Sequence, residues 1–418
     1  MGIDGLDPQA VIEEVARTSY ARLLAYLGVR YRDLAASEDA LSEAFLAALR
    51  SWPRDGVPLR PEAWLLSVAR RRLVDRIRHE FVEAAALPDL AHAMDTFEPF
   101  PDGEFEFPDE RLKLLFVCAH PAIDAAVRTP LMLQCVLRLD AARIASAFVV
   151  KPATMGQRLS RAKTKIRDAR IRFEVPAGEE LPARLGAVLE AVYAAFGTGW
   201  EDIDGGLGTR AGLAEEAIEL GRLLAELLPQ EPEVLGLLAL MLHAHARRHA
   251  RRSATGAYVP LSDQDTALWD EGMTSEANQW LAHAANFHRI GPFQLEAAIQ
   301  SVHNERAVTG ATDWDAATLL YEALVRLAPR LGALVGRCAA LAESQGPESA
   351  LVELDGLPPD SIRDYQPFWA LRAHLLASMN RSHEARAAYS RAIGLCEDVS
   401  MRDYLAERIR DLAPAAGE

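Results

Sequence analysis

Residues 139–167 contain basic and amide side chains of the kinds that recognise the bases and phosphates of nucleic acids. Arginine can donate two hydrogen bonds to guanine, glutamine can pair with adenine, and lysine can neutralise a phosphate. These residue types recur within one short stretch, which predicts a segment that binds DNA in its major groove. The candidate DNA-binding residues are Thr154, Gln157, Arg158, Arg161, Lys163 and Lys165.

Two helices joined by a tight turn are expected to position these side chains. Residues 141–148 carry apolar residues at helical spacing, residues 149–151 form a turn, and Pro152 has the φ angle that a first helical turn requires. In the second helix an apolar stripe would be buried, leaving the candidate residues on other faces. A basic, solvated helix of an ordinary bundle is the alternative. The stripe consists of Met155, Leu159, Ala162 and Ile166.

A second group of candidate residues lies on a predicted helix that begins at Pro61. An aromatic ring followed by a ridge of cations can stack on and steer a single nucleic-acid strand. A solvated charged face beside a core tryptophan is the alternative interpretation. The residues of this group are Trp64, Arg70, Arg71, Arg76 and Arg78, and Leu66, Ala69, Leu73 and Ile77 are expected to face inward.

The segment before this helix is predicted to be helical, and the segment after it is not. Residues 11–29 and 37–49 have amphipathic spacing, with Ser37 as the N-cap of the second helix, and residues 51–56 are expected to form a loop. Residues 83–108 are acidic, rich in Pro and Phe, and lack a sustained period, so they read as a flexible linker.

Charge is distributed unevenly along the 418 residues, whose net charge is −15. Residues 109–172 hold 13 basic and 5 acidic residues, whereas residues 173–418 hold 20 basic and 36 acidic ones. A basic module can bind phosphate through its own face even in an acidic chain, because charges are screened beyond about 8–10 Å. The predicted DNA-binding segment is therefore compatible with the acidic total.

Composition predicts an all-α protein of the cytoplasm. Half of the residues are hydrophobic, β-branched runs are few, and the four cysteines lack the paired spacing of a disulfide framework. The first ten residues lack the apolar core of a signal peptide, and no run of about 18 apolar residues suggests a membrane span.

Residues 174–418 read as repeated helix pairs that form a helical array. The clearest pair covers residues 365–396, where the small and aromatic residues of the second helix resemble a tetratricopeptide repeat. Weaker copies cover residues 213–249 and 314–354. Such arrays bind peptides or partner helices, so a protein or peptide partner of this region is expected.

Catalytic, metal and cofactor sites are not predicted. Nucleotide-binding and nucleophile motifs are absent, and Cys118 with His120 offers too few ligands for zinc. His243 and His245 cannot share a helix face, and the arginines that follow them would repel a cation. We therefore expect no enzyme activity, no metal and no cofactor.

Three ordered segments resemble regions 2 and 4 of an extracytoplasmic function (ECF) sigma factor of bacterial RNA polymerase: residues 38–45, 64–78 and 144–167. This resemblance implies sigma region 2 at residues 1–82, the linker at 83–108, region 4 at 109–173 and a regulatory extension at 174–418. It assigns the group on the helix that begins at Pro61, which includes Trp64, to recognition of the −10 element. It assigns the group from Thr154 to Lys165 to recognition of the −35 element. It also implies that core polymerase binds Asp39, Ser42 and Glu43.

The extension is similar to that of the ECF subgroup with a tetratricopeptide-like tail, in residues 220–224, 262–265 and 312–314. The whole chain is accordingly predicted to be a sigma factor that binds core RNA polymerase and promoter DNA, with an extension that regulates or braces it. One alternative is a tetratricopeptide-type adaptor or DNA-binding regulator that does not engage polymerase. An enzyme hidden in the extension is another.

Overall fold

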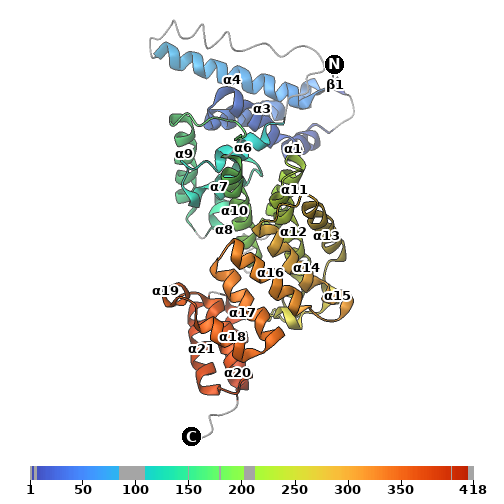
Figure 1. Ribbon diagram of the computed structural model, residues 1–418. Helices are drawn as coiled ribbons and strands as arrows, with labels where there is room; N and C mark the ends of the chain where they lie inside the picture. Colours follow the sequence, from blue (N-terminus) through green and yellow to red (C-terminus); the bar gives the residue numbers. More distant parts are fainter. Residues whose placement is uncertain are drawn as a thin grey trace. The chain divides into compact units, whose positions relative to one another are not determined.

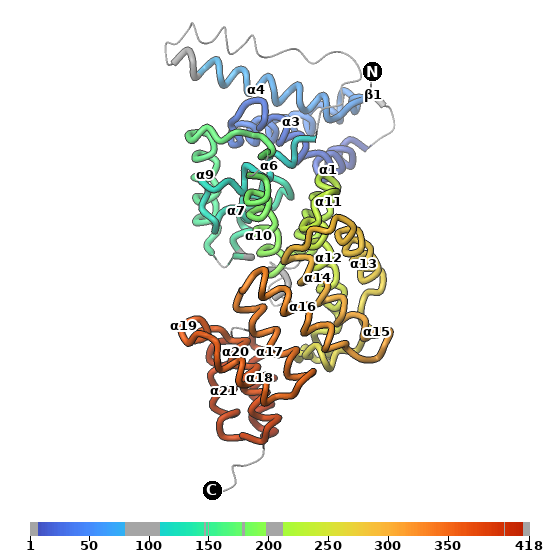
Figure 2. Tube along the Cα trace, in the orientation of Figure 1, coloured from blue at the N-terminus to red at the C-terminus, as the bar shows by residue number. Residues whose placement is uncertain are grey.

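The computed structural model describes residues 2–3, 7–83, 109–148, 150–177, 180–201, 212–396 and 398–412. In these ranges the chain is almost entirely helical, which confirms the predicted all-α class (Figure 1, Figure 2). The strands within them are β1 (Gly2–Ile3) and β2 (Val57–Pro58), which pair antiparallel. The chain divides into two compact units, with residues 1–202 and 207–220 in unit 1 and residues 203–206 and 221–418 in unit 2.

Unit 1 contains two groups of helices. The first bundle consists of α1 (Pro8–Thr18), α2 (Tyr20–Tyr31), α3 (Leu34–Asp55) and α4 (Pro61–Glu83). The second bundle consists of α6 (Arg111–Cys118), α7 (Ala125–Cys135), α8 (Ala141–Ala147) and α9 (Pro152–Asp168), and α10 (Glu180–Glu201) follows it. Residues 84–108, which make up nearly all of the predicted linker, lie outside the described residues.

The first bundle differs from the prediction in three places. The expected helix over residues 11–29 is two helices, because the chain breaks at Ser19, whose hydroxyl donates to Glu62 Oε1 at 3.1 Å. Asp33, not Ser37, is the N-cap of α3, and its carboxylate accepts from Ala36 N at 2.9 Å. Residues 51–55 of the expected loop are the helical end of α3, and Gly56 is its C-cap, since Trp52 is buried in the core and holds this last turn.

The two helices predicted around residues 141–167 are present as α8 and α9. Pro152 opens α9, where its missing N–H leaves no internal hydrogen bond unmade. The predicted apolar stripe is confirmed, because Met155, Leu159, Ala162 and Ile166 are all buried. The stripe packs α9 onto its own bundle and onto α3 of the first bundle.

A buried ion pair joins α3 to α9. Lys163 Nζ donates to Glu38 Oε2, and the side chains are 8% and 16% exposed. Cys135 Sγ, at the end of α7, donates to the other oxygen of Glu38 at 3.6 Å. The prediction that Lys163 lies on an exposed face of α9 is therefore wrong. The lysine lies one turn from Leu159 and Ile166, on the apolar side of the helix, where Glu38 offers it a carboxylate.

Further contacts surround this ion pair. The Arg138 guanidinium lies 4.6 Å from the centre of the Tyr20 ring and also donates to the carbonyl of Ala16. Burial, followed by the nearby negative charge of Glu38, raises the pKa of the Tyr20 hydroxyl. Arg167 of α9 lies 3.8 Å from Asp33. The two bundles of unit 1 are thus joined by a mixture of charged and apolar contacts.

Three helix pairs fall where the sequence predicts them. α11 (Leu213–Leu227), whose first residues belong to unit 1, precedes α12 (Pro232–Ala246). In unit 2, α16 (Trp314–Leu327) packs on α17 (Leu331–Gln345), and α20 (Gln366–Ser378) packs on α21 (Ser382–Leu395). Their assignment to tetratricopeptide repeats stays a prediction. The other helices are the short helices Arg248–Ala250, Leu261–Asp263 and Thr266–Leu268, with α13 (Glu271–Ala285), α14 (Pro292–Asn304), α15 (Arg306–Thr309), α18 (Pro347–Asp355), α19 (Pro359–Ile362) and α22 (Val399–Asp411).

The helix α12 is the centre of the first half of unit 2. It is apolar on every side and almost fully buried, and it packs against both α13 and α14. Gly236 allows the closest approach, since an added Cβ would lie 2.7 Å from the backbone nitrogen of Gln294. An apolar helix needs neighbours on all faces, and this glycine lets α14 supply one of them.

A buried polar network closes the end of α12. Arg247 is 6% exposed, and its Nη1 donates to Asn304 Oδ1 at 2.6 Å while its Nη2 donates to Gln300. The amide of Asn304 in turn lies 3.1 Å from Nδ1 of the fully buried His243. Neutral amides, rather than carboxylates, therefore satisfy this guanidinium.

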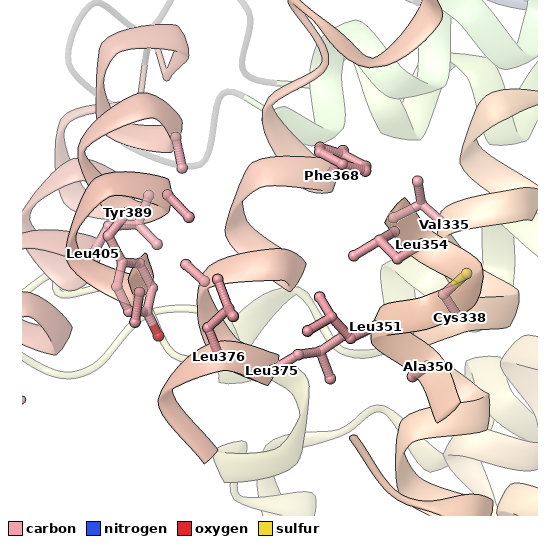
Figure 3. Close-up of a cluster of buried hydrophobic side chains, with 14 of the residues drawn as sticks. Val335, Cys338, Ala350, Leu351, Leu354, Phe368, Leu375, Leu376, Tyr389 and Leu405 are labelled. Atoms are coloured by element: carbon pink, nitrogen blue, oxygen red, sulfur yellow. The ribbon is translucent and has the colours of Figure 1, made fainter. Parts of the chain in front are cut away.

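The C-terminal half of unit 2 has its own hydrophobic core (Figure 3). Phe368 and Leu376 of α20 contact buried side chains of the helices on either side of it. Tyr389 of α21 is also buried, and burial raises the pKa of its hydroxyl to about 12. Small and aromatic residues of α20 and α21 form part of this core, which explains why they occur at these positions in the sequence.

Replacing Lys163 with Met should lower the free energy of unfolding of unit 1 by about 3–5 kcal/mol, because the Glu38 carboxylate would remain buried without its cation. The double variant Glu38→Leu/Lys163→Met removes both charges and should recover most of this loss. Lys165→Met, an exposed neighbour on α9, is the control and should change stability by less than about 0.5 kcal/mol. Urea unfolding followed by circular dichroism measures all three. Equal stability of the Lys163 and Lys165 variants would contradict the assignment.

Unit 2 should lose stability as the pH falls from about 6.5 toward 4. Burial lowers the pKa of His243 to about 3 and that of His303 to about 4, so both stay neutral in the folded chain. The unfolded chain takes up these protons near pH 6.5. The free energy of unfolding therefore falls by up to about 1.4 kcal/mol per pH unit for each histidine as the pH is lowered. His303→Gln should flatten this dependence and the exposed His249→Gln should not, as measured by hydrogen exchange of α12 and α14 between pH 7 and 5.

Candidate nucleic-acid interface

The accessible face of α9 carries most of the predicted base-reading residues. Thr154, Arg158, Arg161 and Lys165 follow one another at spacings of four, three and four, so they form one row along the helix. Thr154 is half-buried and the other three are exposed, as is Gln157 on the neighbouring row. Each member of the row directly precedes a residue of the buried stripe. Core packing therefore fixes this face without covering it.

The cations of this row are available to an outside partner. Among the described residues, Arg158, Arg161 and Lys165 have no acidic side chain within ion-pair distance. Arg167, by contrast, lies near Asp33 and Asp168. The positive charge that is left uncompensated on α9 thus lies along its second to fourth turns, on a face that a duplex could approach with its phosphates and base edges.

The candidate residues of α4 lie on different faces of the helix. Trp64, Arg71 and Arg78 are seven residues apart and share one face. Arg70 lies on the α2 side, where its positive charge opposes the rise that burial causes in the pKa of the Tyr31 hydroxyl. Arg76 faces α3. A single strand following α4 would therefore meet one aromatic ring and two arginines in line.

Trp64 is half-buried and its position is fixed by a second tryptophan. The ring of Trp52, which is 2% exposed, packs against it edge to face with 5.4 Å between centroids and 69° between planes. Such a pair stabilises both rings beyond the area that they bury. The accessible part of Trp64 is thus presented from a rigid support.

The predicted polymerase-binding acids lie on α3 beside the arginines of α4. Asp39 Oδ2 lies 3.4 Å from Arg76 Nη1, and Glu43 Oε2 lies 3.0 Å from Arg72 Nε. Ser42 is exposed on the same helix. All four charged side chains are largely exposed, so each pair contributes little stability and can exchange partners at low cost.

Sequence reasoning missed two residues of these surfaces. Arg72 pairs with Glu43. Arg72 and Arg76 are four residues apart, as are Asp39 and Glu43, and this equal spacing could have predicted two ion pairs between the helices. Glu38, which holds Lys163, directly precedes Asp39 but points to a different side of α3. No sequence pattern identifies that contact, because its partner lies 125 residues away.

The described ranges contain neither a cluster of metal ligands nor a membrane-spanning helix. No group of three or more His, Cys, Asp or Glu side chains there could hold a metal ion. None of the helices in those ranges combines the length and the apolar character that crossing a bilayer requires.

Two known families match parts of the chain. Sigma-70 region 2 matches residues 15–80, which run from α1 to α4, and a family of unknown function (DUF6596) matches residues 184–285, from α10 to α13. No solved structure matches the chain.

A full-length relative shows which family the chain belongs to. "Uncharacterized protein R00370" of Rhizobium meliloti (strain 1021) is 39% identical over 388 residues, which cover 92% of this chain and 91% of that protein. All of α3, and α4 up to residue 80, lie inside the matched region 2. The chain therefore belongs to the same family as the Rhizobium meliloti protein, and its region 2 makes it a sigma-70 family factor.

Proposed function

We propose that this protein is an ECF-type sigma factor, which binds core RNA polymerase and directs transcription to promoters that it recognises itself. The observation that carries the proposal is the pairing of a sigma-70 region 2 with an accessible row of cations on α9. In this mechanism α3 docks on polymerase through Asp39, Ser42 and Glu43. The extension, residues 174–418, braces or regulates the DNA-binding part.

The α4 face would capture the melted −10 strand. Trp64 offers a ring held by Trp52, and Arg71 and Arg78 follow it at intervals of about 10 Å along the helix. Stacking of a base on an aromatic side chain contributes about 1–3 kcal/mol. Docking of α3 on polymerase would draw Asp39 and Glu43 away from α4, and Arg72 and Arg76 would then become available to phosphates.

Promoter binding requires the two bundles to separate. The −10 and −35 elements lie about 25 base pairs apart, or about 85 Å of duplex at 3.4 Å per base pair. α4 has 23 residues and a length of about 35 Å, and α3 beside it contacts α9 directly. The 25 residues between Glu83 and Asp109 have a contour length of about 80–90 Å, which permits the separation. Its main local cost is the loss of the buried Glu38–Lys163 pair.

Reversing the charges of Asp39 and Glu43 to Lys should abolish binding to core polymerase and leave the fold intact, because exposed charges determine docking more than stability. Pull-down with core enzyme and run-off transcription from a promoter selected with the wild-type chain measure the loss. Glu13 and Glu14 of α1, which are also exposed, provide the matched double reversal as a control. Undiminished pull-down by the α3 variant would defeat the proposal. An adaptor that uses DNA without polymerase would show no pull-down even as wild type.

Replacing Arg158 or Arg161 with Ala should weaken promoter binding by about 1–3 kcal/mol and relax base preference, because each arginine can bond guanine bidentately. Lys165→Ala should weaken promoter and random DNA alike and reduce the salt dependence by about one unit. Titrations of both DNAs at several salt concentrations separate these effects. Equal losses on promoter and random DNA for all three variants would remove the assignment of base reading to α9.

A further inference from the structure

A cleft of about 480 Å³ lies in unit 1 where the chain leaves α9 and enters α10. Three elements line it: the residues that follow α9, the first turns of α10, and the connection between α6 and α7. Each of them contributes cationic or hydrogen-bonding side chains, namely Arg170 and Arg172, Arg184, and His120. The cleft is separate from the accessible row of α9.

Arg184 lines the cleft, and a backbone contact holds its guanidinium in place. Its Nη2 donates to the carbonyl of Phe116 at 2.8 Å, but its Nε is buried and has no hydrogen-bond partner among the described residues. Burial lowers the pKa of this guanidinium. Because Nε has no accessible surface, an anion in the cleft can accept only from the part of the Arg184 guanidinium that lines the cleft.

His120 offers a second donor. Its Nδ1 accepts from the backbone nitrogen of Ala122 at 3.1 Å, so the neutral ring carries its proton on Nε2. Burial, followed by the positive charges of Arg184 and Arg128, lowers the pKa of His120, which keeps the ring neutral. A neutral histidine can donate through Nε2 to an oxygen in the cleft that it lines.

Two carboxylates limit how much negative charge the cleft can accept. Glu174 lies 4.0 Å from Arg172 and balances it. Glu180 also lines the cleft, and its negative charge opposes the lowering of the pKa values of Arg184 and His120. Arg170 has no acidic partner in the described part of the chain. This balance suits a compact anion better than a large polyanion.

The wall of the cleft also holds the two bundles together. Ile171 and Phe173 are 5% and 8% exposed, and they alternate with Arg170 and Arg172, which are exposed. The Phe173 ring packs over α2, where an added Cβ on Gly28 would lie 3.0 Å from it. One side of this segment therefore contacts the first bundle while the other faces the cleft.

We propose that this cleft binds a compact oxyanion, a phosphate or carboxylate group, between Arg170, Arg184 and His120. The bound oxyanion accepts from the guanidinium of Arg184 and orders residues 170–172, which line the cleft. The group belongs either to a free small molecule or to the backbone of DNA that has reached the end of α9. This binding does not depend on the proposed role in transcription.

Titration of the full chain with inorganic phosphate, by calorimetry and thermal unfolding, tests the site directly. Arg184→Gln and Arg170→Gln should each weaken phosphate binding about tenfold or more, as expected for the loss of a charge-assisted hydrogen bond. Glu180→Gln should strengthen it, because the competing carboxylate is gone. Bound phosphate should also slow hydrogen exchange of residues 169–174 and of α2.

Arg17→Gln, an exposed arginine of α1, is the control for the loss of one positive charge. Arg170 is exposed, so its variant remains informative if Arg184→Gln unfolds. Titration of each variant with a duplex separates the two sources: equal losses for phosphate and duplex indicate a DNA phosphate, and a loss for phosphate alone indicates a small molecule. No saturable phosphate binding, or identical binding by the Arg17, Arg170 and Glu180 variants, would overturn the proposal. Neither result depends on polymerase.

Discussion

The ion pair between Glu38 and Lys163 is the constraint on which the arrangement of unit 1 depends. Lys163 is buried and Glu38 is largely buried, so removal of either charge leaves the other in a poorly solvated position. Apolar contacts of α9 would tolerate sliding, but a buried charge pair fixes which turn of α9 lies against which turn of α3. The Cys135 thiol further stabilises the Glu38 carboxylate, because it donates to the oxygen that Lys163 does not contact.

Adjacent rows of α9 therefore differ in their surroundings. The buried row runs from Met155 to Ile166 with Lys163 beside it, and the row one residue earlier is accessible and cationic. The first bundle packs on α9 without covering the accessible row. The same packing opposes separation of the two bundles. The cationic row therefore stays accessible while the two bundles remain packed together.

Unit 2 satisfies a buried charge in the opposite way. Arg247 donates to the amides of Asn304 and Gln300 and lies 5.9 Å from the centre of the Trp269 ring. Burial, followed by neighbouring arginines, lowers its pKa to about 10, so it remains charged near neutrality. Amides and a ring have no charge to lose, and this network therefore depends on pH through its histidines rather than through an acidic partner.

Sequence periodicity predicted what depends on local spacing and failed where distant residues decide. The buried stripe of α9 and the opening of α4 at Pro61 follow from helical spacing and from proline at a first turn. Lys163 was misplaced because a lysine reads as exposed unless a carboxylate is known to face it, and Glu38 belongs to another bundle. The break at Ser19 has the same origin, since Glu62 lies 43 residues away. Where a polar residue occurs on the apolar side of a predicted helix, its partner must be sought in three dimensions before a surface role is assigned.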